Sequence, residues 1–225
     1  MKDDYFEDAY KFLEKHPQII GSRIAMIGYC LGTRMTFKMV AYSKVMKLIC
    51  AVCCSGIHVQ PVNGNLEEFQ NYFLENSGKR RMSEKQEIIC RDLLLPIPED
   101  PALKVDMGRV QCPLLIVVGE DDQNWPTYEC AMDIKAMMEK AGNSHLLTLL
   151  TYPNAGHLIE LPYTPHTRTT LARFVPTSRP AMTLWGGQTL GHSRAQEDSW
   201  KKTLAFLREH LYGRINTAVV YTSNL

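Results

Sequence analysis

A five-residue motif, Gly28-Tyr29-Cys30-Leu31-Gly32, sets the strongest limit on how this 225-residue chain can fold. It follows a short apolar run over residues 24–27 and precedes a helical pattern in which Met35 and Met39 face inward. A strand, a tight turn between glycines and a helix form a nucleophile elbow, whose central Ser or Cys is exposed at the helix N-terminus. The motif and its context therefore predict that Cys30 is a nucleophile.

The chemistry of such a turn gives each of its residues an expected role. Gly28 and Gly32 should be small so that the strand and the helix do not clash, and the turn should hold Cys30 in a strained backbone region. The helix dipole and free N–H groups favour a thiolate there. The N–H of Leu31 is the expected oxyanion donor. The alternative, a small buried apolar residue at position 30, leaves the two glycines unexplained.

The partners of such a nucleophile should follow in the order acid and then base, each in a loop after a later strand. Asp122 follows an apolar run at 114–118, and His157 follows one at 146–150. Both would lie at the C-terminal ends of parallel strands, where open α/β sheets place their active sites. The pattern does not separate Asp121 from Asp122 as the residue that orients His157.

Three other residues are weaker candidates for these roles. His58 and His192 lack the setting of a loop after a strand, which His157 has. Ser55 is a conceivable rival nucleophile, but Cys54-Ser55-Gly56 lacks the preceding glycine of an elbow. A Cys-His-Asp triad of Cys30, His157 and Asp122 is therefore the leading hypothesis.

The order of apolar runs and amphipathic stretches predicts an α/β class with a mostly parallel sheet and helices on both faces. Four strands are expected near residues 24–27, 48–54, 113–118 and 146–150. Helices are expected at 3–15, after Gly32, and at 66–74, 127–141 and 197–211, the first of them packed on the sheet. Residues 1–225 are interpreted as one catalytic domain, with 58–107 as a cap or a plain surface excursion and 212–225 as a tail.

Composition excludes several classes of function. A net charge of +1 gives no basic footprint for nucleic acid, and no run of eighteen apolar residues could span a bilayer. The N-terminus lacks the apolar run of a signal peptide. The seven cysteines are expected to be reduced thiols, and Cys50 and Cys53 should point to opposite faces of one strand. No metal site is expected.

The surroundings of the predicted triad resemble the C-terminal catalytic domain shared by acyl-CoA thioesterases and bile acid-CoA:amino acid N-acyltransferases, which have an α/β-hydrolase fold. The matching stretches are spread over nearly the whole chain: Asp4-Tyr5-Phe6-Glu7, His16-Pro17, the elbow, Val118 to Asp122, Asn124-Trp125, Tyr152-Pro153, Gly156 to Glu160, Pro162-Tyr163, Leu184 to Gly187, His192, Ala195-Gln196 and Trp200-Lys201. The joint pattern is much more specific than the elbow alone.

The resemblance implies acyl-CoA thioesters of fatty or bile acids as substrates, with Cys30, Asp122 and His157 at the family's triad positions. Coenzyme A would enter as part of the substrate, and no cofactor is implied. The acyl acceptor would be water, or glycine or taurine.

Two features of this chain depart from the family. Most thioesterase members have serine at the elbow, whereas cysteine is typical of the N-acyltransferases. The family's N-terminal β-sandwich and the first strands of its catalytic sheet have no counterpart here.

Other interpretations remain open at this stage. The elbow is also similar to that of dienelactone hydrolases, which would make the chain a small esterase, and a shortened chain could be a non-catalytic relative that binds acyl groups. Lys79-Arg80-Arg81 could contact coenzyme A phosphates, or be a solvated charge run. The C-terminal Ser223-Asn224-Leu225 is similar to a peroxisomal address, so the expected location is peroxisomal or cytoplasmic.

Overall fold

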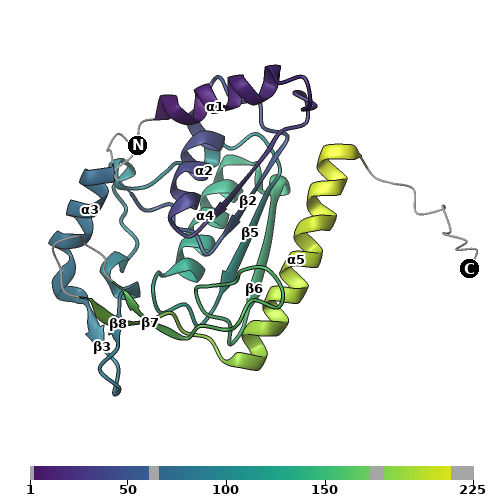
Figure 1. Ribbon diagram of the computed structural model, residues 1–225. Helices are drawn as coiled ribbons and strands as arrows, with labels where there is room; N and C mark the ends of the chain where they lie inside the picture. The colour runs from purple at the N-terminus through teal and green to yellow at the C-terminus, as the bar shows by residue number, and fades with distance from the viewer. Residues whose placement is uncertain (1–2, 61–65, 173–179, 214–225) are drawn as a thin grey trace, which may run out of the picture.

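The computed structural model describes residues 3–60, 66–172 and 180–213 (Figure 1). A parallel sheet of strand order β1-β2-β5-β6 forms its centre. Its strands are β1 (Ala25–Tyr29), β2 (Cys50–Cys54), β5 (Leu114–Gly119) and β6 (Leu147–Tyr152). The four strands and their parallel arrangement were predicted from the apolar runs, with bounds that differ by one or two residues.

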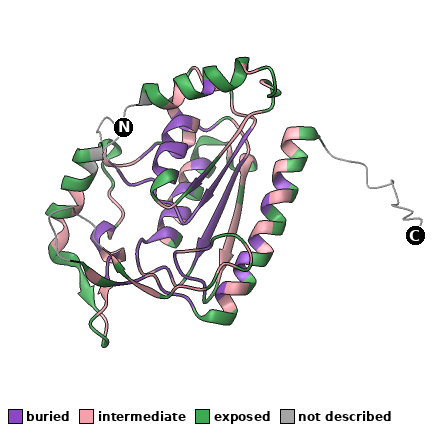
Figure 2. Cartoon of the chain, in the orientation of Figure 1, coloured by how far each residue is buried: buried purple, intermediate pink, exposed green. Residues whose placement is uncertain are grey.

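Helices cover both faces of this sheet (Figure 1). On one face, α2 (Leu31–Tyr42) and α4 (Thr127–Ala141) pack on the sheet in an apolar cluster that includes Phe37, Ile116 and Ile134. On the other face, α5 (Thr189–Tyr212) packs on a cluster that includes Val52 and Val117. The buried residues are concentrated in these layers (Figure 2). Neighbouring residues of one strand serve opposite faces, as strand geometry requires.

The same alternation separates the two cysteines of the C-x-x-C sequence. Cys53 belongs to the cluster under α2 and α4, and Cys50 belongs to the cluster under α5. Their thiols therefore point to opposite faces of β2, as predicted. Within the residues that the structure describes, no group of three or more His, Cys, Asp or Glu side chains could hold a metal ion.

Two helices differ from their predictions. The expected helix at 3–15 is α1 (Asp3–Lys15), but between residues 4 and 15 it buries only Tyr10 and exposes Phe12 and Leu13. It lies at one end of the molecule rather than over a sheet face (Figure 1). Helix α5 begins at Thr189 rather than at Glu197. No helix in the described part of the chain is long and apolar enough to cross a membrane.

A second, smaller sheet was not predicted. Its order is β3-β4-β8-β7, formed by β3 (Arg81–Met82), β4 (Ile88–Ile89), β8 (Ala181–Leu184) and β7 (Thr169–Ala172). The segment 58–107 also contains α3 (Leu66–Glu75), close to the helix expected at 66–74. Because β4 pairs with β8, this segment is joined to the part of the chain that precedes α5.

Strand β1 lies at one edge of the central sheet. Among the described residues it pairs with β2 alone. Its outward side chains stay accessible: Ile27 is 43% exposed and Tyr29 is 41% exposed. The edge that leads into the elbow is therefore open to solvent on one side.

Candidate active site

Cys30 occupies the strained turn between β1 and α2. Its φ of 48° and ψ of −119° lie outside the regions that side chains ordinarily allow. The turn is held by backbone hydrogen bonds, since the Cys30 N–H donates to the Cys54 carbonyl at 3.0 Å and the Thr33 N–H donates to the Cys30 carbonyl at 3.0 Å. The hydroxyl of Thr33 donates to the same carbonyl at 2.6 Å. Strain of this kind is typical of functional positions.

The two glycines of the motif have different steric roles. A Cβ at Gly28 would lie 2.5 Å from Thr36 Oγ1 and 2.9 Å from the backbone of Thr33, so β1 and α2 can approach only because this residue is glycine. A Cβ at Gly32 would meet no atom within 4 Å. The steric reason predicted for Gly28 is therefore confirmed, and the same reason for Gly32 is wrong, because that position faces open space.

Cys30, His157 and Asp122 come together at the C-terminal ends of β1, β6 and β5. Cys30 Sγ lies 3.0 Å from His157 Nε2, and His157 Nδ1 lies 2.8 Å from Asp122 Oδ2. A carboxylate can only accept, so Nδ1 of His157 carries a proton and Nε2 is the nitrogen that exchanges a proton with the sulfur. His157 is 1% exposed and Asp122 is 2% exposed, so both polar groups are buried with partners.

Asp122 is fixed by the first residues of the segment that enters α4. Its Oδ1 accepts the N–H groups of Asn124 and Trp125, both at 2.9 Å, and its Oδ2 accepts the hydroxyl of Thr127 at 2.9 Å. The neighbouring Asp121 faces elsewhere, since its carboxylate accepts the Gly187 N–H at 2.8 Å. The structure thus separates the two acids that the sequence left equivalent.

The imidazole of His157 lies between two indole rings. The Trp125 ring meets it edge-on at 5.3 Å between centroids, and the Trp185 ring stacks on it at 5.6 Å. Burial lowers the pKa of His157, but the charge and hydrogen bond of Asp122 and the contact with Cys30 outweigh it and raise the pKa to about 10. The site therefore stabilises the imidazolium that forms when His157 takes the proton of Cys30.

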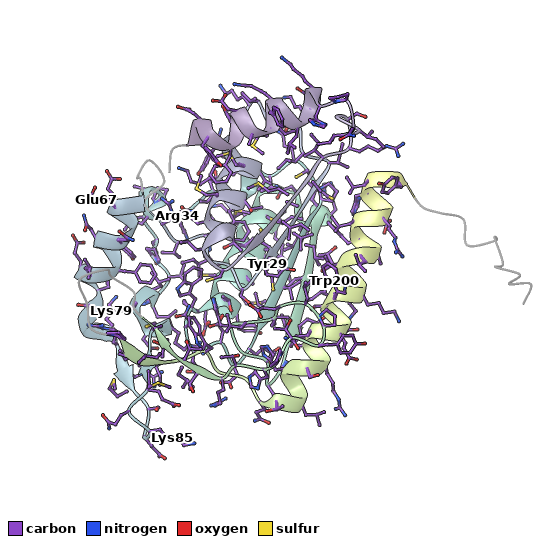
Figure 3. All side chains as sticks on the ribbon, in the orientation of Figure 1. Tyr29, Arg34, Glu67, Lys79, Lys85 and Trp200 are labelled. Atoms are coloured by element: carbon purple, nitrogen blue, oxygen red, sulfur yellow. The ribbon has the colours of Figure 1, made fainter. Side chains whose placement is uncertain are left out.

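A cleft of about 510 Å³ opens beside Cys30. Its walls come from β1, from the ends of β2 and the His157 loop, and from α5; they are Ile27, Tyr29, Cys30, Cys54, Ser55, His157 to Leu161, Thr164 and Trp200. Tyr29 and Trp200 are labelled in Figure 3, where Trp200 extends from α5. The lining is mostly apolar, and Glu160 is the carboxylate that it contains. An elongated apolar group could therefore lie along β1 with its reactive end at the sulfur.

The other six cysteines have raised pKa values and are therefore mostly protonated. Burial raises the pKa of Cys50 and Cys54 to about 12 and that of Cys90 and Cys112 to about 11. Burial likewise raises the pKa of Cys53 and Cys130. Because the thiolate is the reactive form, these six residues are poor nucleophiles near neutral pH.

The pattern of the family described as "BAAT / Acyl-CoA thioester hydrolase C terminal" matches residues 1–213. The chain belongs to this family. It is 29% identical over 95% of its length to acyl-coenzyme A thioesterase 3 of Mus musculus, and 30% identical over 92% to the bile acid-CoA:amino acid N-acyltransferase of Mus musculus. It covers 49% of each relative, so it spans about half of their length.

Solved structures confirm the α/β-hydrolase fold of this family member. An acylaminoacyl peptidase from Pyrococcus horikoshii aligns with 95% of the chain and 28% of its own length, at a TM-score of 0.55 and 15% identity. An α/β hydrolase named MGS-M1, from a deep-sea metagenome library, aligns with 93% of the chain and 64% of its own length, at a TM-score of 0.54 and 14% identity. At such identities the likeness concerns the fold alone.

Other residues singled out in the sequence lie away from the cleft. Lys79, Arg80 and Arg81 are exposed and do not line it; Lys79 Nζ donates to the Leu95 carbonyl at 3.1 Å, and Arg81 is paired with Asp92. Figure 3 shows Lys79 on the side of the molecule opposite Trp200. Their contact with coenzyme A phosphates stays a prediction.

The three weaker candidates also have defined places. Buried His58 bonds Asp133 at 2.7 Å and does not line the cleft. Ser55 lines the cleft at a φ of 52°. His192 lies behind the His157 loop. The Ser223-Asn224-Leu225 address falls outside the described residues.

Three residues that contact Asp122 or His157 were not predicted from the sequence. Thr127 donates to Asp122, and Trp125 and Trp185 enclose the His157 ring. An Asp in a loop typically accepts backbone N–H groups two or three residues on, which fits Asn124 and Trp125 but gave no signal for the Thr127 hydroxyl. Nothing in the pattern indicated that two tryptophans 60 positions apart would meet one histidine.

Proposed function

We propose that this chain cleaves acyl-CoA thioesters through an acyl-cysteine on Cys30, with His157 as base and Asp122 as the carboxylate that orients it. The observation that carries the proposal is the 3.0 Å approach of Cys30 Sγ to His157 Nε2 at the wall of an apolar cleft. Membership of the family supports the substrate class, since the relatives are named acyl-coenzyme A thioesterases and bile acid-CoA:amino acid N-acyltransferases.

In the first half-reaction, His157 takes the proton of Cys30 and the thiolate attacks the thioester carbonyl. The N–H of Leu31, at the start of α2, is the proposed donor to the oxyanion that forms. When the intermediate collapses, the carbon–sulfur bond to coenzyme A breaks and His157 returns the proton to the departing thiolate. The products of this half are free coenzyme A and acyl-Cys30.

In the second half-reaction, His157 takes a proton from the acceptor as it attacks the acyl-Cys30 carbonyl, and the Cys30 thiolate leaves. Water as acceptor gives a free acid, and glycine or taurine gives an amide. We favour the amine, because a thioester intermediate is comparatively prone to aminolysis and Cys at the elbow is typical of the N-acyltransferase branch. The proposed location is peroxisomal, with the cytoplasm as the alternative; one relative is named a peroxisomal succinyl-coenzyme A thioesterase.

The proposal is tested by incubating the purified chain briefly with a long-chain acyl-CoA and measuring intact mass. We expect a gain equal to one acyl group in place of a hydrogen, mapped to Cys30 by peptide mass spectrometry. Cys30→Ala should abolish the adduct. Cys112→Ala is the matched control, because this partly exposed thiol lies outside the cleft and its loss should leave the adduct unchanged. An adduct on another cysteine, with Cys30 unmodified, would contradict the assignment.

The same incubation identifies the acceptor. With glycine or taurine added, the N-acyl product should appear at the expense of free acid. Free acid alone, at an unchanged rate, would assign water as the acceptor and would leave the acyl-Cys30 step intact.

A further inference from the structure

His192, at the first turn of α5, contacts the backbone on both sides of His157. Its Nδ1 lies 3.1 Å from the Gly156 nitrogen and its Nε2 lies 2.7 Å from the Leu158 carbonyl oxygen. His192 is 1% exposed, so both contacts are shielded from water. One buried ring therefore joins the residue before His157 to the residue after it.

The chemistry of these two contacts fixes the state of the ring. The Gly156 N–H can only donate, so Nδ1 of His192 must accept and carry no proton. The Leu158 carbonyl can only accept, so Nε2 must carry the proton. The neutral imidazole satisfies both partners, whereas an imidazolium would turn a second N–H toward that of Gly156. Burial, opposed in part by the Leu158 carbonyl, lowers the pKa of His192, in agreement with the neutral form.

The segment that precedes His192 holds His157 as well. The His157 N–H donates to the Trp185 carbonyl at 2.9 Å, and the Trp185 ring stacks on the imidazole. A Cβ at Gly156 would lie 2.3 Å from the backbone of Gly186, so the two loops are in direct contact. The backbone of Gly156, His157 and Leu158 is thus hydrogen-bonded to residues 185–192. His192 makes two of these three hydrogen bonds, and the Trp185 carbonyl makes the third.

We propose that His192 is a positioning residue, whose ring ties the backbone on either side of His157 and thereby fixes the imidazole at Cys30. The inference rests on the proposed function, because it takes His157 as the base for Cys30. His192 does not touch the reacting atoms and acts through the loop alone. A loop free to shift by about an ångström would separate Nε2 from the sulfur, and misplacements of that size cost on the order of 10²-fold in rate.

Three substitutions of His192 in the full chain test its two contacts separately. His192→Asn can keep an acceptor near the position of Nδ1, His192→Gln can keep a donor near that of Nε2, and His192→Phe keeps the ring shape without either. The control is His210→Phe, the same change on the same helix, at a residue that contacts Phe206 far from the site. Thermal unfolding checks that each variant folds. If His192→Phe does not fold, the proposal is tested with His192→Asn and His192→Gln.

The first readout is the rate at which iodoacetamide alkylates Cys30 at pH 7, followed by peptide mass spectrometry. The buried thiols Cys50, Cys53 and Cys130, which do not line the cleft, report unfolding in the same sample. We expect His192→Phe to slow alkylation of Cys30 about tenfold while the buried thiols stay unmodified, because His157 then no longer assists thiolate formation. Asn and Gln should each recover part of the rate, and His210→Phe should behave as the unchanged chain.

The second readout separates turnover from binding with an acyl-CoA substrate. His192→Phe should lower kcat on the order of 10²-fold and change KM by less than about threefold, as expected when a transition-state contact is lost. Rates within about twofold of the unchanged chain in all three variants would overturn the proposal. So would labelling of the buried thiols in parallel with the change at Cys30, which would indicate a merely structural role. If the chain forms no acyl adduct but Cys30 alkylation still depends on His192, the proposed function fails and the positioning role holds.

Discussion

At the scale of single residues, the structure shows which of the adjacent acids Asp121 and Asp122 faces His157. Asp121 and Asp122 are indistinguishable by pattern, because both follow the same apolar run. The structure distinguishes them through their hydrogen bonds, since Asp122 contacts His157 and Asp121 accepts from Gly187. The sequence thus predicted the loop and the residue type, and the choice between neighbours depended on how the chain turns after β5.

This difference predicts unequal effects of one isosteric change at the two positions. Asp122→Asn should lower turnover roughly 10⁴-fold, because an amide no longer holds the productive tautomer of His157 or stabilises its charge. Asp121→Asn should change turnover little, since the amide oxygen can still accept the Gly187 N–H. Steady-state kinetics with an acyl-CoA compare the two variants, and a larger loss at Asp121 would reverse the assignment.

At the scale of elements, the strands of the central sheet were predicted and the strands of the smaller sheet were not. The central strands are apolar runs, which pattern identifies readily. Strands β3 and β4 have two residues each, too few for any period, and β7 is partly exposed. The first turns of α5 contain Gly191 and few apolar residues, so their helical start had no clear signal. Such elements form because tertiary contacts hold them.

The elbow itself predicts opposite outcomes for its two glycines. Gly28→Ala should destabilise the fold by about 1–3 kcal/mol, because the added methyl overlaps the backbone of Thr33. Gly32→Ala should be neutral or stabilise by up to about 1 kcal/mol, since this position of α2 is open and alanine favours helix. Urea unfolding of the two variants measures the difference. Equal destabilisation would show that Gly32 is also sterically required.

At the scale of the whole molecule, buried His58 links stability to pH. Burial lowers the pKa of His58 below its ordinary value near 6.5, although Asp133 opposes the shift. At His58 the unfolded chain therefore takes up a proton below about pH 6.5 that the folded chain excludes, so the contribution of this residue to stability falls as the pH falls. Asp133 stays ionised in this range, because its pKa is lowered to about 2, chiefly by its hydrogen bond with His58.

We expect His58→Gln to weaken this dependence. The variant should be less stable at pH 7 but lose less of its melting temperature between pH 7 and pH 5 than the unchanged chain. Other titrating groups, His192 included, are common to both proteins, so the difference between the two curves isolates His58. Parallel curves would show that His58 does not contribute to acid sensitivity. The sequence indicated neither the burial of His58 nor its partner, because Asp133 lies 75 positions away.

The open edge of the central sheet has an evolutionary consequence. Cys30, Asp122 and His157 follow strands of one hydrogen-bonded sheet, whereas the cleft beside them is walled in part by Ile27 and Tyr29 on exposed β1. The reacting groups and these two wall residues are thus different side chains, although Cys30 directly follows β1. Because Ile27 and Tyr29 are exposed, substitutions at these two positions can reshape the cleft during divergence while the sulfur, ring and carboxylate are inherited unchanged.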